Sequence, residues 1–132
     1  MKKKNKKIDP IFIRAADRKI GKAAHGKFTI KETILGGGRI PYITQIAVST
    51  LRLGKTEPKP HRHPTMWEIY FVLKGKATHQ VGKKKYKVAP GDFLAVPPNM
   101  SHNQIVTKAP HVVYYFGIAT DGKVRGEVKS AI

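Results

Sequence analysis

Two histidines one residue apart, followed five positions later by a glutamate, are the residues of this chain whose types and spacing best suit metal chemistry. They are His61, His63 and Glu68, within PHRHPTMWEIYFVLKG (60–75). Side chains two apart on a strand point to the same face, so both imidazoles can reach one point in space. Glu68 follows a short turn, and an antiparallel return would bring its carboxylate back to the histidines. The pattern favours a metal site; the alternative is a loop with incidental histidines before a buried strand.

A third histidine, His102, follows the proline-rich turn VPPNMS (96–101) at the start of another strand-like run. It is too far along the chain for periodicity alone to place it beside the first three residues. If it converges with them, the set is three neutral nitrogens and one carboxylate. Such a set suits one divalent transition metal, either Fe, Mn, Ni, Co or Zn, and leaves coordination positions open for water or substrate.

The remaining side chains argue against most other chemistry. The chain has no cysteine, which excludes a thiolate metal site, a disulfide and a cysteine nucleophile. It has 8 acidic residues, and once Glu68 serves as a ligand none is well placed as the second carboxylate of a glycosidase-type pair. No serine stands beside a free histidine in a nucleophile arrangement. Chemistry carried out by a metal is what remains.

Four polar or aromatic residues are predicted to line the pocket around such a metal. Alternation along a strand places Tyr70 on the face of Glu68 and Gln104 on the face of His102. Buried aromatic packing is the alternative for the tyrosines. The candidates are Tyr70, Gln104, Gln45 and Tyr114. The other histidines are expected to be structural: His25, His79 and His111.

Short strands must position these residues, because from residue 27 onward the chain is a succession of β-forming runs separated by turn formers such as GGGR (36–39). No segment shows the apolar period of a helix of about ten residues, which a mixed α+β domain would require. An all-β antiparallel sandwich or small barrel is therefore predicted. The expected strands cover 28–34, 42–51, 67–73, 77–81, 85–89, 92–97, 102–106 and 111–118.

The spacing of the glycines, histidines and glutamate resembles the first motif of the cupin family. That motif is a glycine, five residues, His-x-His, three or four residues, a glutamate, six residues and a glycine. The matching positions here are Gly54, His61, His63, Glu68 and Gly75. Six residues rather than five precede His61, which lengthens the entry loop and is not expected to disturb the histidine pair.

A second cupin motif is also similar to this sequence. In the family it is a glycine, five residues, Pro-x-Gly, two residues, a histidine, three residues and an asparagine, and it aligns with Gly91, Pro97 and His102. Asn99 replaces the turn glycine, but asparagine tolerates a positive φ, so the turn is expected to survive. Val106 replaces the terminal asparagine, which puts a structural hydrogen bond in doubt and leaves the ligands unchanged.

The resemblance spans about residues 40–118 and implies a double-stranded β-helix, or jelly-roll, barrel. It implies that the metal ligands are His61, His63, Glu68 and His102. The leading hypothesis is a small metal-dependent cupin that acts on a small anionic or oxygen-rich molecule, as an isomerase of the sugar-phosphate type or a dioxygenase. The alternative is a non-catalytic cupin module that binds or senses a small ligand.

Three segments are predicted: a basic N-terminal segment 1–26 with an edge strand at PIFIR (10–14), the barrel over 27–118, and a charged tail over 119–132. The net charge of +18 is concentrated in MKKKNKK (1–7) and in GKKKYK (82–87), which is expected to be a hairpin tip. Aromatic residues are not interleaved with this charge, so a solvated basic surface that steers anionic ligands is favoured over nucleic-acid binding.

The distribution of apolar residues along the chain bears on the cellular location and on the oligomeric state. No run is long enough to span a membrane, and MKKKNKK is not followed by the apolar segment of a signal peptide, so a cytoplasmic protein is expected. Ile69, Phe71 and Leu73 alternate with Glu68 and therefore point away from the metal. They leave more apolar surface than one barrel interior can take, which predicts a homodimer.

Overall fold

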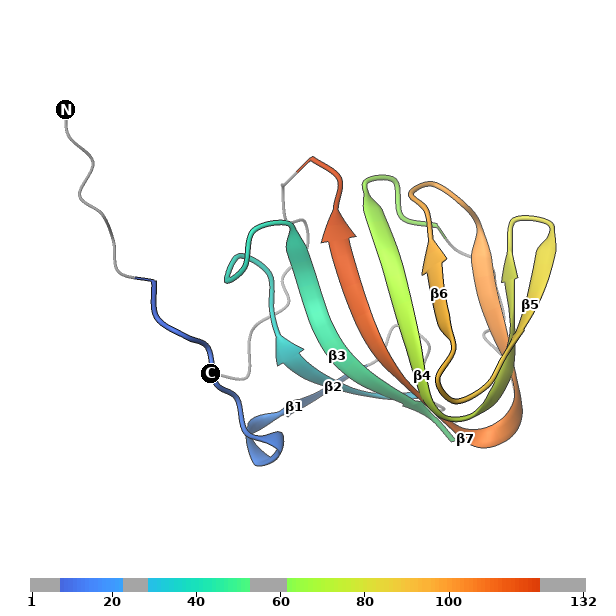
Figure 1. Ribbon diagram of the computed structural model, residues 1–132, viewed down its shortest axis with the longest axis horizontal. Coiled ribbons are helices and arrows are strands. Elements are labelled where there is room, and N and C mark those ends of the chain that lie inside the picture. Colours follow the sequence, from blue (N-terminus) through green and yellow to red (C-terminus); the bar gives the residue numbers. More distant parts are fainter. Residues whose placement is uncertain (1–7, 23–28, 53–61, 122–132) are drawn as a thin grey trace.

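The computed structural model describes residues 8–22, 29–52 and 62–121, and nearly all of their regular structure is β-strand (Figure 1). The one helical element in these ranges is a 3-10 turn, η1 (Ala15–Asp17). The strands are β1 (Lys19–Lys22), β2 (Thr29–Leu35), β3 (Ile43–Leu51), β4 (Met66–Val81), β5 (Lys84–Val88), β6 (Phe93–Val96) and β7 (His102–Ala119). The all-β prediction is confirmed.

Two long strands, β4 and β7, hold the sheet together. The strand order is β1-β2-β3-β7-β4-β5, with β6 paired to β4 as well, and the pairings among the described strands are antiparallel. The pairing of β4 with β7 runs from Met66 opposite Ala119 to Val81 opposite His102. In Figure 1 both strands curve strongly, so that β7 passes from the side of β5 to the side of β3. The sheet thereby curls into the predicted jelly-roll barrel.

The bend in β4 lies at Gly75, and the alternation of inward and outward side chains changes phase there. Before the bend the buried residues are 68, 70 and 72, whereas after it they are 77, 79 and 81. The register with β7 shifts at the same place, as expected for β-bulges. The facing part of β7 changes phase too, between Val106 and His111. The bend therefore decides which side chains of both strands face the interior.

The interior of the barrel combines an apolar core with buried polar side chains. The core cluster consists of Tyr70, Val72, Ala77, Val81, Val88, Val96 and Val113. The same strand faces bury Glu68 on β4 and His102 on β7, with 3% and 5% of their surface exposed. A charged or polar group inside a protein is costly unless it is paired. Glu68 and His102 are therefore candidates for a functional site.

The strand predictions from residue 28 onward match the structure in type and approximate position, with two differences. The runs 67–73 and 77–81 are one strand, β4, and the runs 102–106 and 111–118 are one strand, β7. Gly75 bends β4 without ending it, because both halves keep their partner on β7. The predicted hairpin tip is present between Val81 and Lys84.

The N-terminal edge strand was predicted at the wrong position. It is β1, which pairs with β2 through Lys19 opposite Thr33, whereas residues 10–14 form no strand. The lysines of 1–7, His25, and the tail beyond residue 121 lie outside the described residues. Within the described ranges, no helix has the length and apolar character needed to cross a membrane.

Replacing Gly75 with alanine should destabilise the fold more than the same change at Gly91. Both glycines have a positive φ, +73° and +92°, so alanine costs about 1–2 kcal/mol of backbone strain at either position. Only at Gly75 would the new Cβ also collide with the carbonyl oxygens of Pro110 and Lys108, whereas Gly91 has nothing within 4 Å.

We expect urea denaturation to show a loss of unfolding free energy of about 3 kcal/mol or more for Gly75→Ala and about 1–2 kcal/mol for Gly91→Ala. Equal losses in the two variants would mean that the contact with β7 does not require glycine at the bend.

Candidate metal centre

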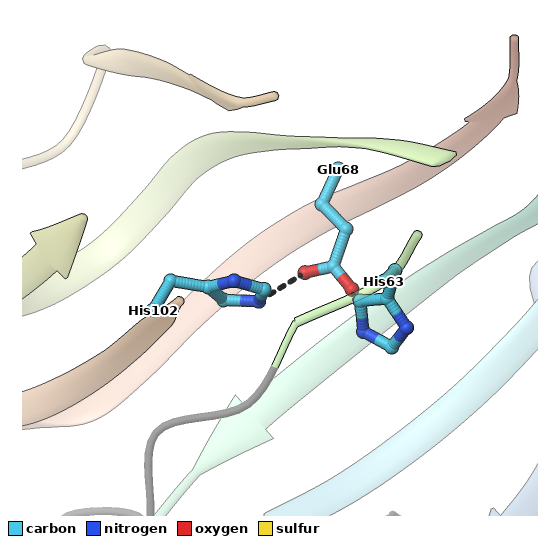
Figure 2. A group of neighbouring side chains, drawn as sticks. All are labelled: His63, Glu68 and His102. Atoms are coloured by element: carbon cyan, nitrogen blue, oxygen red, sulfur yellow. Dashed lines mark hydrogen bonds and ion pairs between the residues drawn. The ribbon is translucent and has the colours of Figure 1, made fainter. Parts of the chain in front are cut away.

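Glu68 is the centre of the site. It lies near the start of β4 with 3% of its surface exposed, and Gly117 of β7 faces it in the register. A Cβ at position 117 would collide with the Thr44 hydroxyl and the Met66 sulfur, so glycine allows these side chains to pack closely against β7 beside the site. Figure 2 shows His63 and His102 on either side of the carboxylate, one beside each oxygen.

His102 is held in a defined orientation at the start of β7. Its Nδ1 lies 3.0 Å from the carbonyl oxygen of Met100, and its Nε2 lies 3.0 Å from Oε2 of Glu68. Because a carbonyl oxygen can only accept, Nδ1 must carry the proton of this hydrogen bond. The Nε2 atom is thus the nitrogen directed at the carboxylate, an arrangement typical of metal-binding histidines.

His63 reaches the site from the loop before β4. Its Nε2 lies 2.5 Å from Oε1 of Glu68, and 38% of its side chain is exposed. The backbone N–H of Asn99 donates to the carbonyl oxygen of His63 at 2.7 Å, so the turn before β7 ties down this loop. Asn99 has a φ of +62°, which confirms that asparagine can take the place of the turn glycine.

Two tyrosines complete the surroundings of the carboxylate. The Tyr70 hydroxyl donates to Oε2 of Glu68, and the Tyr115 hydroxyl donates to Oε1 at 3.2 Å. Burial alone would raise the pKa of Glu68, but the close polar contacts with His102, His63 and Tyr70 hold that pKa well below its usual range. Burial and the nearby carboxylate raise the pKa of Tyr115, so its phenol keeps its proton.

The residues fit a divalent metal. The ligand atoms of His63, Glu68 and His102 all lie within 4.8 Å of one another. Since Nδ1 of His102 donates to Met100, a neutral His102 presents a lone pair to a carboxylate oxygen 3.0 Å away. Two acceptors at that distance need a second ring proton or a cation between them. Nitrogen and oxygen donors of this kind suit Fe, Mn, Ni, Co or Zn.

His61, the fourth predicted ligand, lies outside the described residues, so its ligand role stays a prediction. The other three predicted ligands are brought together from the loop before β4, from β4 and from β7. The alternation of side chains along a strand could not predict how these three segments lie relative to one another. His102 pairs with Val81 at the far end of β4, and because β4 bends at Gly75 it still reaches Glu68 near the start of that strand.

Three of the four predicted pocket residues face the interior. Tyr70 bonds to Glu68, and Gln104 is buried opposite His79. Gln45 is also buried, but its Nε2 donates to the Thr33 hydroxyl at 3.1 Å, so it joins β3 to β2.

Tyr114 does not face the pocket, contrary to the prediction. It lies opposite Phe71 on the outward face, and its ring contacts Phe116 at 6.5 Å between centroids. The phase change in β7 turns Tyr115 inward instead, to bond with Glu68. The apolar run 111–118 shows no break that would reveal this change of phase. The sequence therefore predicted Tyr114, and not Tyr115, as the pocket residue.

Two of the three histidines expected to be structural, His79 and His111, are buried in the barrel. His79 and His111 have 3% and 0% of their surface exposed, and their rings meet edge-on at 5.8 Å. The Nδ1 of His111 lies 3.3 Å from the carbonyl oxygen of Lys74. Burial and the neighbouring His111 and His102 lower the pKa of His79 to about 3, so its imidazole is neutral at physiological pH.

A matched pair of variants tests the role of Tyr115. Tyr115→Phe keeps the ring but removes the hydrogen bond to Glu68, whereas Tyr114→Phe removes an outward-facing hydroxyl. Loss of a group that supports a ligand costs about tenfold in metal affinity, and loss of a hydrogen bond to a charged group costs about 1.5–3 kcal/mol of stability.

Competition with a chromogenic chelator should therefore show weaker metal binding for Tyr115→Phe and wild-type binding for Tyr114→Phe. Equal affinities in the two variants would mean that Tyr115 does not support the ligand carboxylate.

Comparison with known proteins agrees with this fold. Two solved structures similar to the chain are KdgF from Halomonas sp. and a predicted oxalate decarboxylase from Thermotoga maritima, with TM-scores of 0.71 and 0.73. The KdgF match has 14% identity and covers 84% of this chain and 94% of that one. The Thermotoga match has 16% identity and covers 83% and 99%. At such identities the likeness shows the fold alone.

A third structure, a tyrosine-to-phenylalanine variant of Streptomyces PAC13 with uridine, has a TM-score of 0.68 and 10% identity, covering 93% of this chain and 95% of that one. In sequence, the uncharacterized protein MJ1618 of Methanocaldococcus jannaschii is 36% identical over 42 residues, or 32% of this chain. That match spans only about a third, 34%, of the curated relative's length.

The sequence profile of the family described as Cupin domain matches residues 47–117, more than half of the chain. The matched range contains Glu68 and His102, the two buried members of the site. With the curled antiparallel sheet and the convergence of His63, Glu68 and His102, the chain belongs to the cupin family.

Proposed function

We propose that this protein is a small metal-dependent enzyme that acts on a small anionic or oxygen-rich molecule. A divalent metal bound by His61, His63, Glu68 and His102 would leave coordination positions open toward the pocket. The reaction would be an isomerisation of the sugar-phosphate type or an oxidation by dioxygen. Both reactions use a substrate that binds through oxygen atoms.

The observation that carries this proposal is the orientation of His102. Its Nδ1 is committed to the Met100 carbonyl, so Nε2 faces Oε2 of Glu68, and Nε2 of His63 faces the other carboxylate oxygen. A purely structural ion pair would need no second imidazole on the far side of the same buried carboxylate. A shared cation would account for both imidazole contacts with the carboxylate.

When bound, the metal would polarise a substrate carbonyl or hydroxyl as a Lewis acid, or activate dioxygen if it is iron. The tyrosines Tyr70 and Tyr115 hold Glu68 in place through both of its oxygens. His79 contacts the Tyr70 ring at 5.2 Å between centroids and stays neutral, so it offers a polar group behind the site without adding charge.

The second candidate function is a non-catalytic module that binds or senses a small ligand. The same ligands and pocket residues would serve it, and a barrel lined by neutral polar groups such as Gln104 and His79 also suits binding alone. Turnover separates the two functions: a ligand recovered unchanged from the metal-loaded protein favours the module, and conversion favours the enzyme.

Metal content tests the proposed site directly. Protein purified without a histidine tag should carry one metal per chain by elemental analysis. His63→Ala and Glu68→Ala should lose most of it, because each removes one of the converging ligands. Arg62→Ala is the matched control, since Arg62 neighbours His63 in the chain and is exposed.

Equal trace metal in wild type, His63→Ala and Glu68→Ala would contradict the metal site. The identity of the metal then directs the search for activity. Iron calls first for measurements of oxygen uptake, whereas zinc or manganese calls for isomerase substrates.

The protein is further proposed to be a homodimer that buries the outward face of β4 and β6. Phe71 lies opposite Phe93 of β6 on one side and Tyr114 of β7 on the other. Phe71 and Leu73 are each 41% exposed and Phe93 is 60% exposed. A second copy seated on this face would cover adjoining apolar side chains that one barrel leaves in water.

Light scattering should therefore give about twice the chain mass of 14.7 kDa. Phe93→Lys should give the mass of one chain, because it places a charge at the centre of the buried contact. Phe12→Lys is the control, since Phe12 is 69% exposed in the N-terminal segment and lies outside this face. Wild-type protein with the mass of a single chain would exclude the dimer.

A further inference from the structure

Lys31 is a lysine on the inward face of the barrel wall. It lies on β2 between the buried residues Thr29 and Thr33, with Ser49 of β3 opposite it. Alternation along the strand turns its neighbour Glu32 to the other face. The sequence did not predict a role for Lys31, because nothing in the sequence distinguishes it from the other lysines and arginines, 26 in total.

The ammonium group of Lys31 lies over the ring of Tyr115, one of the two tyrosines that bond to Glu68. Its Nζ lies 5.0 Å from the centroid of the Tyr115 ring, and the hydroxyl of that tyrosine donates to Glu68. Burial lowers the pKa of Lys31, and the charge of Glu68 acts in the opposite direction. Among the described residues no carboxylate forms an ion pair with Lys31, so the ring face is its main partner there.

The balance of charge around the metal centre indicates what could bind there. Glu68 is the only buried carboxylate among the described residues, and metal-binding histidines are neutral. A divalent metal carries two positive charges, of which Glu68 cancels one, and Lys31 adds one at a separate place. Two centres of single positive charge remain, one at the open side of the metal and one at Nζ.

We propose that Lys31 binds a second anionic group of the ligand, so that the pocket selects short dicarboxylic acids. One carboxylate would bind at the metal and the other would pair with the Lys31 ammonium, above the Tyr115 ring. Each carboxylate would match one centre of single positive charge. The inference rests on the metal site of the proposed function.

The test compares acids with their monoamides on the metal-loaded full chain. Succinate and succinamate have the same length and differ in one carboxylate, as do glutarate and glutaramate. A hydrogen-bonded charge pair contributes about 1.5–3 kcal/mol, so titration calorimetry should show at least one diacid binding about tenfold or more tightly than its monoamide. Lys31→Met should remove that preference, and Lys31→Arg should retain most of it.

The controls separate this role from net charge and from structure. Lys87→Met removes one positive charge from the exposed face of β5 and should keep the preference for the diacid. Lys31→Met should still bind its metal and should bind the monoamide as the wild type does, which a structural defect would not allow.

A diacid preference that persists in Lys31→Met overturns the inference while leaving the metal site intact. Wild-type protein that binds diacid and monoamide equally overturns it without any variant. Wild-type protein that binds no metal instead overturns the proposed function, so the two failures are distinguishable.

Discussion

The structure depends on how one buried carboxylate is paired. An ionised glutamate inside a β-barrel costs several kcal/mol unless its oxygens are satisfied, and Glu68 is ionised because four side chains surround it. Those side chains come from the loop before β4, from β4 itself and from both ends of β7. The carboxylate therefore joins segments far apart in the chain, and the same contacts that make its charge tolerable leave imidazole nitrogens directed at one place.

The bends of β4 and β7 determine which residues meet there. Without the bend at Gly75, the inward and outward side chains of β4 would alternate in one phase along the whole strand, and His79 would face outward. With it, residues 68, 70 and 72 in one half and residues 77, 79 and 81 in the other all face the same interior. The matching phase change in β7 selects Tyr115 over Tyr114 and thereby supplies both a hydrogen bond to Glu68 and an aromatic surface for Lys31. Fold and site are therefore products of the same irregularity.

Most of the fold and part of the site were predictable from the sequence. Short β-forming runs and turn residues predicted an all-β barrel. The spacing of His63 and Glu68, together with the resemblance to the cupin motifs for His102, pointed to three residues that the structure does bring together. Alternation failed where a strand bends, because a period of two carries no information about a phase change at Gly75 or in the facing part of β7. Lys31 was missed for a different reason, since only the pairing of β2 with β3 shows that it faces inward.

The most direct test of the central claim is a crystal structure of the protein grown with zinc or manganese, with anomalous diffraction recorded at the metal's absorption edge. The account predicts one strong anomalous peak within bonding distance of Nε2 of His63, Nε2 of His102 and a carboxylate oxygen of Glu68, about 2.0–2.3 Å from each. A protein that binds the metal elsewhere, with Glu68 and the two histidines in direct contact and no peak between them, would contradict it.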